Sequence, residues 1–151
     1  MTVSDSARST TAAESRFRLQ SPNAQPRLML VAVLDPDSAK ATASLANQAW
    51  HGVVFVDGAD VAPGHWPEIL AAADADVVML VASTGHRLDA AREIGNYSMR
   101  HGIKVSAVLL TERSPMQAVS DALQALRPWT RTLTLLEDTF YLHGLLHALG
   151  N

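Results

Sequence analysis

Short apolar runs alternate along most of the chain with longer segments in which apolar residues recur every three or four positions. Short runs rich in Val, Ile and Leu are typical of strands in a parallel sheet that is covered on both faces. The longer period is typical of amphipathic helices. The pattern predicts five strands, at residues 28–34, 53–56, 76–82, 103–110 and 132–136.

Helices are expected in the segments between and after these strands. Asp37 or Ser38 is expected to cap the first helix, which runs to about Trp50. Its sheet-facing side is expected to be rich in alanine, with Ala41, Leu45, Ala46 and Ala49. The other helices are expected at residues 66–73, at residues 87–100, between Ser114 and Pro128, and from about Thr139 to Gly150.

This alternation predicts an α/β fold, a single three-layer doubly wound domain at residues 27–151. Its five-stranded, mostly parallel sheet is expected to be Rossmann-like or flavodoxin-like. Right-handed crossovers leave two strand orders open, 2-1-3-4-5 and 3-2-1-4-5. Residues 1–26 are rich in Ser, Thr, Ala and Arg and are expected to form a disordered tail. Their arginines also fit an organelle transit peptide, which the interspersed Asp5 and Glu14 disfavour.

Composition narrows the functional classes. The 151 residues include no Cys, which excludes disulfides, Cys-ligated metal centres and a thiol nucleophile. A formal net charge of −3 argues against a nucleic-acid-binding protein. The longest apolar run is far shorter than the roughly 20 residues that span a bilayer, so no membrane association and a cytoplasmic location are expected.

Candidate chemistry lies just after the strands, because ligands of open parallel sheets bind beyond the carboxyl ends of the strands. The candidate ligand-binding or phosphate-binding residues are Asp35, Asp57, Ser83, Thr84, Gly85, His86 and Thr111. Asp35, Asp37 and Asp57 offer the oxygen ligands that Mg2+ prefers. The alternative for these aspartates is helix capping and turn formation.

The loop of Ser83, Thr84 and Gly85 is the best local candidate for an anion site, because small residues before a helix can direct N–H groups at a phosphate. An ordinary helix cap explains the same residues. Ser83 and His86 also form a conceivable Ser–His pair, but no G-x-S-x-G motif accompanies them. Asp35 stands where a dinucleotide-binding fold has glycines, and its charge repels a pyrophosphate.

Residues 71–112 run from an apolar strand through the small-residue loop of Ser83, Thr84 and Gly85 and a helix to Gly102, then to a strand that ends at Thr111. This stretch resembles the middle of the nucleotide-binding half of the FtsZ/tubulin family. The resemblance implies a degenerate relative in which the glycine-rich phosphate loop is reduced, and which serves binding or assembly.

Three further residues are singled out near the end of the chain. His143 and His147 lie four apart on the last predicted helix, a spacing that suits a metal site, although no HExxH motif is present. The alternative is a structural role beside the leucine stripe. Trp129 is the leading candidate for an interface residue, because a large amphipathic ring outside a helical stripe can anchor a partner.

No constellation supplies a nucleophile, a base and oxyanion donors together. The sequence therefore favours a non-catalytic interaction or assembly subunit, either homo-oligomeric or bound to another protein, and is compatible with sensing of a small anionic ligand. One alternative is a nucleotide-binding or phosphate-binding enzyme that uses the strand-end loops. The other is a metal-binding accessory protein. The sequence specifies no cofactor.

Overall fold

The computed structural model describes residues 28–150, and the expected tail at residues 1–26 lies outside the described residues. The described elements are β1 (Met29–Val33), α2 (Pro36–Ala46), β2 (Val53–Asp57), the 3₁₀ helix η1 (Gly58–Asp60), α3 (Trp66–Ala73), β3 (Val77–Ser83), α4 (Asp89–Arg100), β4 (Lys104–Leu110), α5 (Met116–Leu126), the 3₁₀ helix η2 (Arg127–Trp129), β5 (Thr132–Leu136) and α6 (Phe140–Gly150).

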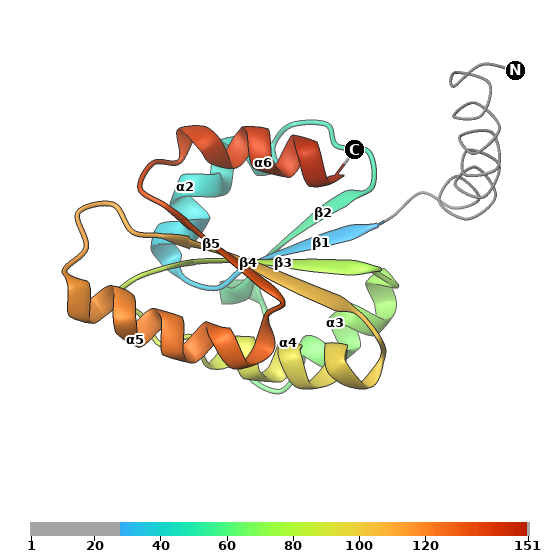
Figure 1. Ribbon diagram of the computed structural model, residues 1–151. Helices are drawn as coiled ribbons and strands as arrows, with labels where there is room; N and C mark the ends of the chain where they lie inside the picture. The colour runs from blue at the N-terminus through green and yellow to red at the C-terminus, as the bar shows by residue number, and fades with distance from the viewer. Residues whose placement is uncertain (1–27, 151) are drawn as a thin grey trace, which may run out of the picture.

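The five described strands form one all-parallel sheet in the order β2-β1-β3-β4-β5. In Figure 1, α2 and α6 cover one face of the sheet, and α3, α4 and α5 cover the other. The predicted three-layer α/β fold is therefore confirmed, with the flavodoxin-like strand order. The alternative order 3-2-1-4-5 is wrong, since β1 lies between β2 and β3.

The core has two parts, one on each face of the sheet. All five residues of β1 are buried, with alternate side chains entering the two parts. Leu30 packs with Leu70, Ile94 and Leu126 from α3, α4 and α5. On the other face, Val31 packs with leucines of α2 and α6. This two-sided burial explains the continuous apolar runs, because no face of the central strands meets water.

Helix α2 differs from its prediction at both ends. Asp35 caps it, in place of Asp37 or Ser38, and the helix ends at Ala46, short of Trp50. Its buried residues are Ser38, Thr42 and Leu45, whereas Ala46 and Ala49 are exposed. The expected face is therefore wrong at Ala46 and Ala49, whereas Leu45 and Ala41 do pack on the core. The two hydroxyls are tolerated inside because Thr42 Oγ1 donates to the Ser38 carbonyl at 2.8 Å and Ser38 bonds to Asp35.

The segment before β5 also refines the prediction. Helix α5 ends at Leu126, and Pro128 lies within η2. Trp129 in η2 is half-buried and packs on α4 at Gly95, where an added Cβ would lie 2.6 Å from the Trp129 Cβ. Gly95 thus permits this close helix contact.

Within the described part of the chain, no helix is long and apolar enough to cross a membrane.

Candidate functional site

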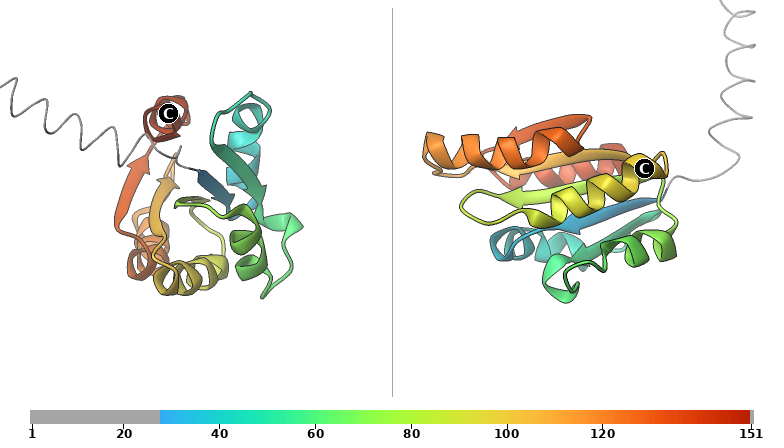
Figure 2. Two further views of the ribbon diagram at one scale, coloured as in Figure 1. Left: turned by 90° about the vertical axis from the view of Figure 1, so that its right-hand side faces the viewer. Right: turned by 90° about the horizontal axis from the view of Figure 1, so that it is seen from below.

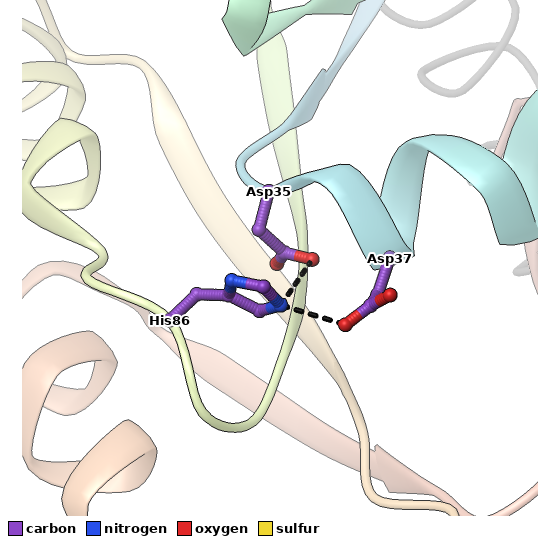
Figure 3. Close-up of side chains that lie close together, drawn as sticks. All are labelled: Asp35, Asp37 and His86. Atoms are coloured by element: carbon purple, nitrogen blue, oxygen red, sulfur yellow. Dashed lines mark hydrogen bonds and ion pairs between the residues drawn. The ribbon is translucent and has the colours of Figure 1, made fainter.

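The candidate site lies at the topological switch point, at the carboxyl ends of β1 and β3. The next strand along the chain, β2, lies beside β1 at one edge, and β3 lies on the opposite side of β1. Asp35 follows β1 and Asp37 lies in the first turn of α2, whereas Ser83 ends β3 and His86 lies in the loop after it. Figure 3 shows the Asp35 and Asp37 carboxylates both near the same ring nitrogen of His86. The fold therefore joins chain segments about fifty residues apart.

Asp35 is the buried centre of the site, with its side chain only 1% exposed. Its carboxylate accepts the Ser38 amide at 2.8 Å and the Ser38 hydroxyl at 3.0 Å. It also accepts the Ser83 amide at 2.7 Å and the Ser83 hydroxyl. Four donors from two elements thus hold one carboxylate, and each of its oxygens takes two of them.

His86 connects this buried carboxylate to solvent. Its Nε2 lies 2.7 Å from Asp37 Oδ2 and 3.8 Å from Asp35 Oδ1. The hydrogen bond to Asp37 raises the pKa of His86, and the negative charges of Asp35 and Asp37 raise it further, against the opposing effect of burial. The ring is partly exposed and Asp37 largely exposed, so an ion or small ligand can reach them.

A pocket of about 410 Å³ opens beside these residues at the carboxyl ends of β3, β4 and β5. Its ionisable residues are four acids and a single lysine, namely Asp37, Glu112, Glu137, Asp138 and Lys40. Thr84 and Ser114 lie in its wall and hydrogen-bond each other. This balance of charge favours cations over anions.

The geometry also bears on the predicted phosphate site. The N-terminus of a helix attracts anions, and at α2 that place is taken by the Asp35 carboxylate. The same carboxylate takes the amide and hydroxyl of Ser83. Ser83 therefore directs its donors at a protein carboxylate.

Other predicted strand-end residues have roles in the backbone. Asp57 accepts the Ala59 amide at 2.9 Å and caps η1. Thr111 donates its amide to the Leu136 carbonyl at 2.9 Å, so it ties β4 to the end of β5. Gly85 has a φ of +83°, which explains glycine at this turn. Their roles in ligand binding stay predictions.

The predicted histidine pair on α6 forms a separate cluster. The Nε2 atoms of His143 and His147 lie 3.2 Å apart, and His143 Nε2 is 3.2 Å from Gln48 Oε1. The His147 ring lies 4.6 Å from the Trp50 ring, centroid to centroid. Metal binding by this pair stays a prediction, as does an interface role for Trp129.

Sequence reasoning missed the residues that complete the site. Ser38 was read only as a possible cap, although it is the second partner of Asp35. The spacing of Asp35 and Ser38, three apart at a helix start, is the signal that could have identified the cap and its donor. Ser114 and Lys40 carry no comparable signal, since their place in the pocket depends on the packing of β4 and α2.

Comparison with known proteins adds no assignment. No protein-family model and no curated protein sequence matches this chain. The resemblance to the FtsZ/tubulin family therefore stays a prediction, and the functional argument depends on the site itself.

Proposed function

We propose that this chain is a non-catalytic binding domain that takes a divalent transition-metal ion at Asp35, Asp37 and His86. The observation that carries the proposal is geometric. One ligand atom from each of these three residues lies within 4.8 Å of the other two, at the switch point of the sheet. Two carboxylate oxygens and one imidazole nitrogen make a mixed donor set that suits Zn2+ or Mn2+ better than Mg2+.

The surroundings of the three residues support metal binding. Metal-ligating carboxylates are commonly held by hydrogen bonds from an outer shell, and the backbone amides of Ser38 and Ser83 supply that shell to Asp35. The ion would take the Asp35 Oδ1 lone pair that the rotatable Ser83 hydroxyl occupies here, because the four donors together fill the carboxylate. A metal ion would replace the proton that His86 and Asp37 share at 2.7 Å. The acidic pocket next to them adds an attractive potential for cations.

Binding without catalysis fits the way the candidate nucleophile is used. Ser83 donates its hydroxyl to Asp35, while His86 directs its Nε2 at Asp37. This division of partners disfavours a Ser–His nucleophile and base. A phosphate-binding enzyme at the same loops is likewise disfavoured, because Asp35 fills the N-terminus of α2 and also takes the amide and hydroxyl of Ser83.

Isothermal titration calorimetry on the untagged, metal-stripped full chain tests the proposal, with Zn2+ and Mn2+ as separate titrants. We expect one ion per chain. The His86→Gln and Asp37→Asn variants should each weaken binding by at least about tenfold, because each loses one ligand. Asp57→Asn is the matched control, since this strand-end aspartate lies outside the cluster, and its affinity should equal that of the wild type.

Two results would overturn the proposal. One is the absence of binding heat for both ions. The other is unchanged affinity in both His86→Gln and Asp37→Asn. If affinity were instead lost in a His143→Gln/His147→Gln variant, the metal site would move to α6.

A further inference from the structure

The sheet ends in two edge strands of different character. In Figure 2, left, β5 forms one outer edge and β2 the other. No strand pairs with the outer side of β5 among the described residues. Soluble proteins commonly protect such an edge with a charge, a proline or a bulge, because an open edge pairs with other chains. The five residues of β5, Thr-Leu-Thr-Leu-Leu, include none of the protecting residue types.

We infer that β5 pairs antiparallel with β5 of a second copy of this chain, which joins two sheets into one of ten strands. The argument begins with the side chains on one face of the strand. Leu133 packs on the core beneath α5, and Leu135, two positions further on, lies on the same face but is 47% exposed. Arg131 and Glu137 continue this alternation at the two ends and are exposed.

The segment from Arg131 to Glu137 is complementary to itself when it runs antiparallel. With Thr134 at the two-fold axis, Leu133 lies opposite the partner's Leu135. Arg131 lies opposite the partner's Glu137, so the dimer contains two such pairs of opposite charge. Within the described part of the chain, neither Arg131 nor Glu137 has an ion-pair partner. An isologous contact of this kind closes as a two-fold dimer.

The opposite edge lacks this complementarity, which is why we assign the contact to β5. Strand β2 ends in Asp57, and self-pairing centred on Phe55 would place that carboxylate opposite the apolar Val53. Val54 is 42% exposed, so the edge is accessible but poorly matched to itself. It provides a control site with a similar apolar residue.

Analytical ultracentrifugation of the full chain, in buffer with a chelator, tests the inference independently of the metal site. We expect a species of twice the 16.2 kDa chain mass. Leu135→Lys should raise the dissociation constant at least about tenfold, because it places a charge in the centre of the contact. Val54→Lys, on the other edge, should leave it unchanged.

A charge exchange makes the test specific to the antiparallel pairing. Arg131→Glu or Glu137→Arg alone sets like charges opposite each other and should weaken the dimer. The double variant Arg131→Glu/Glu137→Arg restores opposite charges and should return the dissociation constant to near the wild-type value. Because both residues are exposed, these variants keep the test valid if Leu135→Lys fails to fold.

Three outcomes would overturn the inference. The first is a wild-type chain that sediments as a monomer at the highest concentration tested. The second is a dimer whose dissociation constant is unaffected by all the β5 substitutions, whether or not Val54→Lys disrupts that dimer. The third is a double charge variant that associates no better than either single variant.

Discussion

Both ends of the parallel sheet carry aspartates and a histidine, but the two ends use them differently. At the carboxyl end, Asp35 bonds to a side chain at the end of β3, and His86 bonds to one in the first turn of α2. At the amino end, His101 Nδ1 lies 2.8 Å from the Tyr97 carbonyl of its own helix, and its ring stacks on that of Tyr97. Asp76 there accepts one backbone amide, from Leu28, at 3.0 Å.

The difference shows at which end of the sheet this fold brings polar side chains from separate segments together. The amino-end groups complete helix ends and strand entries, and each is exposed. The carboxyl-end groups converge because the crossovers before and after β2 place two loops side by side at the switch point. The same residue types are thus structural at one end and a candidate site at the other.

The largest expected effect is on the free energy of unfolding when an aspartate is removed from either end of the sheet. Asp35→Ala leaves the buried Ser38 and Ser83 donors without their acceptor and should lower the free energy of unfolding by about 3 kcal/mol. Asp76→Ala removes one exposed hydrogen bond and should cost about 1 kcal/mol or less. Urea unfolding followed by circular dichroism measures both. Equal losses in the two variants would contradict the contrast between the ends.

The next effect concerns the packing that joins η2, before β5, to α4. Gly95→Ala should destabilise the protein by about 2 kcal/mol, since the new methyl group would overlap Trp129. Gly144→Ala in α6 is the matched control, because nothing lies within 4 Å of its added Cβ. That variant should gain up to about 1 kcal/mol from the lower backbone entropy of the unfolded chain. Thermal unfolding of both variants checks the prediction, and a neutral Gly95→Ala would refute it.

The smallest effect is a pH dependence confined to the carboxyl end. The pKa of His86 is raised in the folded protein, chiefly by the Asp37 hydrogen bond. Its contribution to stability is therefore fully present below the unfolded value of about 6.5 and is lost as the pH rises through the higher folded value. In metal-free buffer, the stability advantage of the wild type over Asp37→Asn should shrink across this window.

Unfolding midpoints measured at several pH values test this dependence. His101→Gln serves as the comparison from the amino end, because its imidazole bonds to a backbone carbonyl and not to a carboxylate. A wild-type advantage over Asp37→Asn that stays constant from about pH 5 to about pH 9 would show that His86 does not gain its proton affinity from Asp37.

Much of the fold could be predicted from local pattern. Each of the five strands begins and ends within one residue of the predicted position, for example 132–136 for β5. Apolar runs locate strands well because the central strands are buried on both faces. Helix ends were less predictable. Asp35, Asp37 and Ser38 are all residue types that cap helices, and the structure shows that Asp35 is the cap of α2.

The candidate site was predicted only as a set of residues. Asp35, Ser83 and His86 were singled out because each follows a strand, but their sequence positions do not say which loops meet. The short contacts between Asp35 and Ser83, 48 positions apart, exist because β1 and β3 are neighbours in the sheet. Asp57 lies at a strand end as well, but β2 lies on the side of β1 away from β3, and Asp57 is not part of the cluster.

The sequence by itself determined the strands, the α/β class and the chemistry available at the strand ends, because apolar periodicity and residue type are local properties. Only the tertiary structure decided the strand order, the pairing of Asp37 with His86 and the exposure of β5 at an edge. Right-handed crossovers permit more than one order, so those outcomes depend on how the helices share the two faces of the sheet.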